Sequence, residues 1–287
     1  MRIFLTMMMC CLFAATSAQV QIRIDQGDTK QKMEPIDDEL FAVEYEMKFI
    51  ADTSKRDKVQ TEMMMLKVGQ KLSSFYSYSR WLADSALTAL KKSGTQPSVD
   101  AIIETSKKYQ SRISYSLYKN YPQNKVTTLD ELAKGRYRCE ENNDMPEWEL
   151  LPDETATVLN YPCQKAVCHF KGRDYEAWFT PDIARGEGPW KLYGLPGLIL
   201  RAQDAQKEYV FEAVALKQAK ENDKITFGAE GYESVSRKDL NKLFERYAAD
   251  PIGFLKSSAP NIRVMIKDDT GAEIKPKNTP YNPIEKN

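Results

Sequence analysis

Two runs of residues decide the fold, GRDYEAWFTP at 172–181 and GPWKLYGLPGLIL at 188–200. In the first run, the odd-numbered residues from Arg173 to Phe179 alternate with the even-numbered residues from Asp174 to Thr180. A period of two is typical of a β-strand, because successive side chains of a strand point to opposite faces of the sheet. The first run therefore predicts a strand.

The second run predicts a reversal of the chain at Leu195-Pro196-Gly197-Leu198. A type II turn takes proline where φ is fixed at about −65° and glycine where φ is positive. We expect the chain to turn at this point and to enter a second strand at Leu198. Residues 208–214 are again rich in apolar side chains, and they would pair with that strand as a hairpin.

Further motifs on both sides of these runs occur in the order found in a known family. They are NYPCQKA at 160–166, F-x-G-R at 170–173, AWFT at 177–180, GPWK at 188–191, GLPGLIL at 194–200 and YNPIE at 281–285. With these motifs the sequence resembles the GLPGLI family, extracytoplasmic proteins of Bacteroidota. Asn160 and Ala184 stand where that family usually has glycine and proline. The resemblance implies an exported protein with a GLPGLI-type domain, and it brings no settled biochemical activity.

Residues 1–18 have the pattern of a secretory signal peptide. Arg2 supplies the positive start, residues 3–15 form an apolar run too short to span a bilayer, and the small residues at 16–18 fit a cleavage site before Gln19. We therefore expect a periplasmic or secreted protein, with one domain over residues 19–287. No other stretch approaches the roughly 20 apolar residues of a membrane helix, so we expect no transmembrane segment after signal cleavage.

The charge balance argues against nucleic acid as a partner. The chain has 41 lysine and arginine residues against 41 aspartate and glutamate residues. A chain without a basic excess has no broad attraction to phosphate backbones or anionic lipid. We therefore expect no nucleic-acid binding.

Three cysteines, Cys139, Cys163 and Cys168, would remain in the mature chain. On one strand, Cys163 and Cys168 would lie about 16 Å apart at about 3.3 Å per residue, beyond the ~7 Å that a disulfide allows between Cα atoms. An exported protein meets an oxidising environment. Cys163 follows Pro162 at a strand entrance, whereas Cys168 shares a face with Phe170. We therefore predict a bridge between Cys139 and Cys163, with Cys168 as a buried free thiol.

The remaining pattern predicts an α+β fold. Residues 42–50, 58–68 and 71–79 are predicted as strands, residues 84–92 and 99–109 as helices with Ser98 or Asp100 as candidate caps, and more strands follow up to residue 214. Apolar residues at helical spacing after Ser236 predict a helix up to Ala249, and residues 261–267 a last strand. We expect a curved, half-barrel-like antiparallel sheet of about eight to ten strands, with helices inserted after the third strand and one C-terminal helix.

The residues favour binding over catalysis. His169 is the single histidine, and a lone histidine on a strand is more often a surface residue than a general base. Asp174 and Glu176 share a strand face, as the acids of a solvated edge also would. No Cys-x-x-Cys or His-x-x-x-His spacing occurs, and Met63 to Met65 fit core packing better than Cu(I), so we predict no catalytic residue, metal or cofactor.

The candidate binding residues are Arg173, Trp178, Trp190, Leu195, Pro196 and Gly197. Trp178 and Trp190 flank a polar loop, and the glycines let the backbone approach a partner closely. The alternative is that both tryptophans lie in the core, that Arg173 pairs with an acid such as Glu176 or Glu212, and that the glycines serve turns.

Our leading hypothesis for function is an exported, non-enzymatic binding or envelope-assembly protein. Its partner would be an envelope protein, a peptide or an apolar ligand. The alternatives are a secreted hydrolase that uses acidic residues and a purely structural envelope component.

Overall fold

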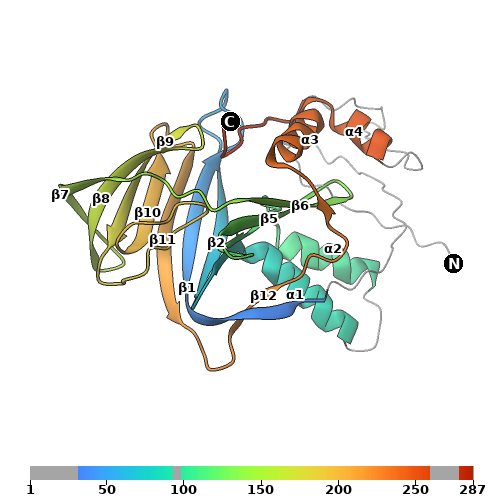
Figure 1. Cartoon of the computed structure of the whole chain (residues 1–287). Helices are drawn as coiled ribbons and strands as arrows, with labels where there is room; N and C mark the ends of the chain where they lie inside the picture. The colour runs from blue at the N-terminus through green and yellow to red at the C-terminus, as the bar shows by residue number, and fades with distance from the viewer. Residues whose placement is uncertain (1–31, 93–97, 259–277, 287) are drawn as a thin grey trace.

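The computed structural model describes residues 32–92, 98–258 and 278–286. These residues form one large sheet with helices beside it (Figure 1). The strands in chain order are β1 (Glu34–Ile50), β2 (Val59–Gly69), β3 (Ser73–Ser77), β4 (Ser116–Lys119), β5 (Lys125–Leu132), β6 (Gly135–Asn142), β7 (Glu149–Val158), β8 (Tyr161–Phe170), β9 (Arg173–Thr180), β10 (Leu198–Asp204), β11 (Tyr209–Gln218), β12 (Lys224–Phe227) and β13 (Glu233–Ser234). The predicted signal peptide at 1–18 and the predicted strand at 261–267 lie outside the described residues.

The strand order of the sheet is β13-β6-β5-β4-β3-β2-β1-β11-β10-β9-β8-β7, and β12 pairs with β1 beside this path. Neighbouring strands are antiparallel except β13 and β6, which are parallel. Within the described residues, β13 and β7 end the order, so the sheet is open rather than closed on itself. The fold is mostly β, which confirms an antiparallel sheet with inserted helices but not the half-barrel shape.

The helices follow the third strand as predicted, but the first helix begins at Tyr78 instead of the predicted Asp84. Helix α1 (Tyr78–Lys92) and helix α2 (Val99–Lys108) follow β3, as predicted. The predicted third strand ran to Ser79, but the strand ends at Ser77 and α1 begins there. The reason is a capping contact, because the Arg80 N–H donates to Ser77 Oγ at 3.1 Å, as in an N-cap.

The caps that the sequence predicts are present. Ser98 Oγ accepts from the Ala101 N–H at 3.2 Å, and Ser236 Oγ accepts from the Asp239 N–H at 3.1 Å. Helix α3 (Arg237–Ala249) therefore begins and ends where expected. A second C-terminal helix, α4 (Pro251–Ser258), was not predicted; its proline occupies the first helical position, where no N–H is needed.

Two tight turns build the meander β7-β8-β9. Leu159 and Asn160 have φ of 49° and 65°, and Lys171 and Gly172 have φ of 49° and 74°. Positive φ at both central residues is the type I′ turn, whose twist matches that of two-residue hairpins. The strand predicted at Arg173 and the hairpin between β10 and β11 are both confirmed.

The main core lies on one face of the sheet, here called the inner face, which carries Val43, Tyr45 and Met47 of β1. The loop of residues 181–197, between β9 and β10, is packed into this core through Trp190, Leu192 and Leu195. The loop also contacts β4, because Lys119 Nζ donates to Gly188 O at 2.8 Å. The loop is therefore part of the interior.

The corner at Leu195-Pro196-Gly197 differs from the predicted type II turn. The positive φ expected at Gly197 is absent, and the Gly197 N–H donates to Leu195 O at 2.8 Å. A bond between residues i and i+2 makes a γ-turn. Glycine is needed for another reason, because a Cβ at Gly197 would lie 2.1 Å from Thr180 O.

The predicted disulfide is also wrong. Cys139, Cys163 and Cys168 are all buried and unpaired in the described part of the chain. Cys139 lies on β6 and Cys163 on β8, and these strands stand at opposite ends of the sheet order. A bridge requires Cα atoms within about 7 Å, which strands so far apart in one sheet do not provide. Cys168 is buried, as predicted.

Candidate binding site

The residues predicted to bind a partner do not lie on one surface. Arg173, Trp190 and Leu195 are buried on the inner face, whereas Trp178 is half-buried on the opposite, outer face of β9. The period of two explains the split between Arg173 and Trp178, which are five residues apart. Of the corner residues, Pro196 is exposed and Gly197 is buried against the end of β9.

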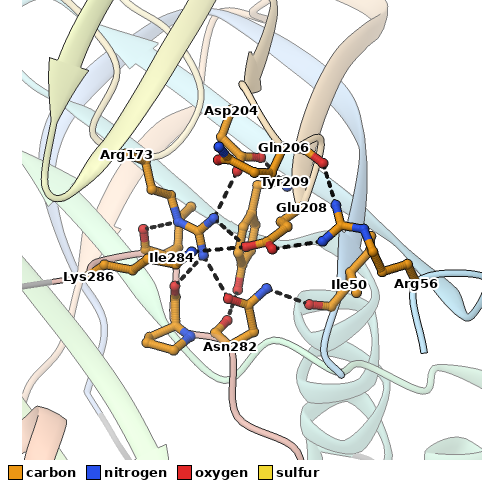
Figure 2. A network of polar contacts seen from close by, with 11 residues as sticks. Ile50, Arg56, Arg173, Asp204, Gln206, Glu208, Tyr209, Asn282, Ile284 and Lys286 are labelled. Carbon is orange, nitrogen blue, oxygen red and sulfur yellow. Dashed lines mark hydrogen bonds and ion pairs between the residues drawn. The ribbon is translucent and has the colours of Figure 1, made fainter. Parts of the chain in front are cut away.

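The Arg173 guanidinium is enclosed by two carboxylates (Figure 2). Nη1 donates to Asp204 Oδ2 at 2.9 Å and to Glu208 Oε2 at 2.8 Å, and the Arg173 side chain is only 1% exposed. Burial alone would raise the pKa of Glu208, but hydrogen bonds from Arg173, Lys286 and Arg56 lower it to about 2. Glu208 is therefore a stable anion that Arg173 neutralises.

The rest of the guanidinium binds the C-terminal tail, defined here as residues 281–286. Nε donates to Ile284 O at 2.9 Å, and Nη2 donates to Asn282 Oδ1 at 2.9 Å and to Pro283 O at 2.7 Å (Figure 2). On the other side, Tyr209 Oη donates to Asn282 O at 2.7 Å. Arg173 thus joins β9 to a segment more than a hundred residues away in the sequence.

A second buried network continues along the tail. Lys191 Nζ, from the loop 181–197, donates to Glu141 Oε2 at 2.6 Å and to Glu285 Oε1 at 2.7 Å. Arg237 of α3 donates to the same Glu141 oxygen at 2.6 Å. Burial would raise the pKa of Glu141, but Lys191 and Arg237 lower it to about 2. Asn282 and Glu285 therefore connect the two networks through the tail.

The outer face around Trp178 carries paired charges. Lys165 Nζ and Arg201 Cζ each lie 5.6 Å from the Trp178 ring centroid, within range of a cation–π contact. Lys165 pairs with Glu176 at 3.0 Å and Arg201 with Glu212 at 2.6 Å. Glu176 and Glu212, proposed as partners of Arg173, thus lie on the other face and pair with these two cations.

The edge strand β7 offers main-chain groups to solvent. Val158 and Tyr161 close a two-residue hairpin, so they form a hydrogen-bonded pair, and the next pair, Thr157 with Pro162, is a non-hydrogen-bonded pair. The N–H and C=O of Thr157 consequently point away from β8. No strand of the described chain pairs with that side of β7. On the same strand, Leu150 is 47% exposed.

A hollow of about 550 Å³ lies beside β8 and β9, and its polar lining includes Glu147, Glu149, His169, Asp174 and Glu176. His169 Nδ1 and Asp174 Oδ1 are 2.6 Å apart, and both side chains are exposed. The described residues contain no group of three or more histidine, cysteine, aspartate or glutamate side chains that could hold a metal ion.

A cysteine nucleophile is disfavoured at this hollow. Cys168 is part of the lining, but burial raises the pKa of its thiol to about 12. The reactive form of cysteine is the thiolate, so Cys168 is inert at neutral pH.

Comparison with known proteins supports a family likeness over a short stretch. The pattern of a family described as "Protein of unknown function (Porph_ging)", of Bacteroidota type, matches residues 170–201, which cover the turn before β9, the loop 181–197 and the start of β10. This match does not bear the GLPGLI name. No curated protein matches the chain by sequence. In the described residues, no helix is both long and apolar enough to cross a membrane.

Two solved structures of PNGF-II are similar to this chain. The P21 form has a TM-score of 0.49 at 15% identity and the C2 form a TM-score of 0.46 at 17% identity. The matches cover 73% and 71% of this chain, and 34% and 32% of the PNGF-II chains. This chain therefore spans about a third of the length of those structures.

Proposed function

We propose that this chain is an exported, non-enzymatic protein of GLPGLI type, periplasmic or secreted, that binds a peptide strand and serves in recognition or envelope assembly. Its domain would cover residues 19–287 after removal of the signal peptide, with the sheet curved as a half-barrel. The observation that carries the proposal is the open edge of the sheet at β7.

An open edge of this kind can accept a further strand. In strand addition, main-chain hydrogen bonds provide affinity, and pockets for alternate side chains provide specificity. The pairing of β7 with β8 is irregular between Leu151 and Thr155, so the regular part of the edge runs from Thr155 to Val158. Leu150, on β7 before this irregularity, exposes an apolar side chain on the same edge strand. These features support a peptide over an apolar small molecule as the partner.

Two observations favour the alternatives. The acidic hollow with the His169–Asp174 pair is the place where a secreted hydrolase would act with acidic residues. The buried charge networks, by contrast, suit a structural envelope component whose main task is to stay folded.

The test is to block the edge without disturbing the sheet. Proline at an outward-facing position of an edge strand removes only a solvent-facing N–H, so Thr157→Pro should leave the fold intact. Native mass spectrometry of wild-type protein purified from its own host should show a co-purified peptide mass, which Thr157→Pro loses. Thr157→Val keeps the N–H and should keep the mass.

The melting temperature of Thr157→Pro checks that the fold persists. A folded Thr157→Pro protein that retains the bound mass would contradict the proposal, as would wild-type protein without one. Hydrolysis of an envelope substrate that disappears in Asp174→Asn would favour the enzyme instead.

A further inference from the structure

The C-terminal tail is held through both its backbone and its side chains. Its carbonyls at Asn282, Pro283 and Ile284 accept hydrogen bonds from Tyr209 and Arg173. At its end, the Lys286 N–H donates to Lys171 O at 3.0 Å. The tail carries neither helix nor strand, so the protein holds it as it would hold a bound peptide.

Three side chains of the tail add specificity, and one of them is Lys286, whose Nζ donates to Glu208 Oε2 at 3.1 Å. Asn282 is 9% exposed, accepts from Arg173 and donates through Nδ2 to Ile50 O at 2.8 Å. Glu285 is 7% exposed and receives Lys191. Between them, Ile284 packs against the main core. The tail site, defined as Ile50, Lys171, Arg173, Lys191 and Tyr209, therefore recognises the sequence Asn-Pro-Ile-Glu.

The charges of the tail site stay paired without the tail. Arg173 keeps Asp204 and Glu208, and Lys191 keeps Glu141. A buried charge becomes costly when its partner is removed, and neither cation would be left alone. The tail can therefore leave without stranding a buried cation.

Apolar contacts contribute little to holding the tail. Ile284 is the tail residue that packs against the main core, and Tyr281 is 38% exposed, with its ring stacked on Phe244 at 6.5 Å between centroids. Directional polar contacts hold the tail in its site. A segment with the same sequence can make every one of these contacts, so it can replace the tail.

We propose that the tail site is a peptide-binding site that exchanges its own residues 281–286 for the same segment of a second copy of the chain. The second copy is the occupant we favour, because its identical sequence fulfils each contact. Exchange of an identical element between copies is a low-cost route to association. This inference concerns a different face from the β7 edge and does not depend on the proposed function.

The first experiment uses a full-length chain that cannot hold its own tail, Asn282→Ala with Glu285→Ala. The probe is a fluorescein-labelled peptide of residues 278–287, NTPYNPIEKN. The peptide should bind this variant, and it should bind the wild-type chain at least about tenfold more weakly, because a tethered tail competes at an effective concentration in the ~mM range. A peptide with alanine in place of Asn282 and Glu285 is the matched control and should not bind.

The second experiment leaves Asn282, Glu285 and the tail site unchanged. It therefore does not depend on whether the chain with Asn282→Ala and Glu285→Ala folds. A photo-crosslinking amino acid in place of Tyr281 should give covalent dimers, joined near Phe244 of the other copy, whose share rises with protein concentration. A folded variant that ignores the peptide would overturn the proposal. Crosslinks only within one chain at low and high concentration would do the same, and a different captured protein would reject the second copy as occupant.

Discussion

Asp130 is a buried carboxyl group on β5 that, within the described residues, makes no direct hydrogen bond or ion pair with the two networks that hold the tail. Its Oδ1 accepts from Ser114 Oγ at 2.6 Å and from the Glu131 N–H at 2.8 Å. Burial raises its pKa to about 6, against the smaller effects of these hydrogen bonds and of Arg237 and Arg80. The folded chain therefore keeps a proton on Asp130 at a pH where an unfolded chain has lost it.

This difference predicts the pH dependence of stability. An unfolded aspartate titrates at about 3.9, so the folded state binds more protons between about pH 4 and pH 6. The contribution of Asp130 to the free energy of unfolding should fall as pH rises through this window, by on the order of 2–3 kcal/mol, and stay constant above it. Asp130→Asn should remove that slope. Urea unfolding of both proteins between about pH 4 and pH 7 measures it.

The two carboxylates whose pKa is lowered, Glu141 and Glu208, change the free energy of unfolding in the opposite direction and at lower pH. Glu141 and Glu208 have pKa values of about 2, so their contribution is present above the unfolded pKa and lost as pH falls from about 4.5 toward 2. Both are unchanged in Asp130→Asn, so their effect cancels in the comparison. Parallel curves for the two proteins would show that Asp130 does not titrate as described.

For single residues, the sequence predicts which face of the sheet a side chain lies on, but not which distant residues it contacts. The period of two places Arg173 and Trp178 on opposite faces, which should have separated them in the predicted binding set. The true partners of Arg173 are Asp204, Glu208 and the tail, and they lie 31 to 111 residues away, where no local pattern points. The one available signal was the YNPIE motif at 281–285, which holds Asn282 and Glu285.

Among the elements, the loop 181–197 joins the sheet to the second charge network through Lys191. Lys191 reaches Glu141 and Glu285, while Trp190 packs against Phe170 with ring centroids 6.0 Å apart. The loop returns to the sheet at Gly197, where it passes directly against the end of β9. A loop of this kind is as much part of the core as a strand is.

Gly197→Ala tests this close approach. The new Cβ would lie 2.1 Å from the backbone oxygen of Thr180, and backbone cannot move aside as a flexible side chain can. We expect the free energy of unfolding to fall by about 2–4 kcal/mol. Thermal unfolding measures the loss. Pro196→Ala, at the exposed neighbouring position, is the control and should change stability by about 1 kcal/mol or less.

The outcome separates two explanations of the same glycine. If Gly197 served only a turn conformation, with no backbone near its Cα, then Gly197→Ala and Pro196→Ala would melt at similar temperatures.

The elements themselves were largely predictable, because they depend on local rules. Strand β9, the caps Ser98 and Ser236 and the end of α3 follow from periodicity and capping chemistry. The boundary between β3 and α1 was misplaced because Ser77 fits both a strand and an N-cap. The corner at Gly197 was misassigned because proline followed by glycine fits a γ-turn as well as a type II turn, and the choice depends on Thr180.

On the scale of the whole molecule, the strand order depends on long-range pairing. β1 lies between β2, its neighbour in sequence, and β11, which follows it by more than 150 residues. Local periodicity does not encode such pairing, so the order could not be read from the chain. The predicted bridge between Cys139 and Cys163 is wrong for this reason. The expected exposure of each cysteine does not show that β6 and β8 lie far apart in the sheet.

The thiols of Cys139 and Cys163 therefore report on opening of the sheet. Cys139, Cys163 and Cys168 are buried in different strands, and burial raises the pKa of each thiol. Opening a domain costs on the order of 5 kcal/mol or more, so less than about one molecule in a thousand is open at any time. In native protein, alkylation of Cys139 and Cys163 should be slower by about a thousandfold or more than in urea, whereas Cys168, which lines the hollow beside β8 and β9, should react faster than these two. Thr61→Cys, at an exposed position of β2, is the control and should react at once.

Mass spectrometry of peptides prepared without reductant should find each cysteine free. A peptide in which Cys139 is joined to Cys163 would contradict the strand order, which places β6 and β8 near opposite ends of the sheet.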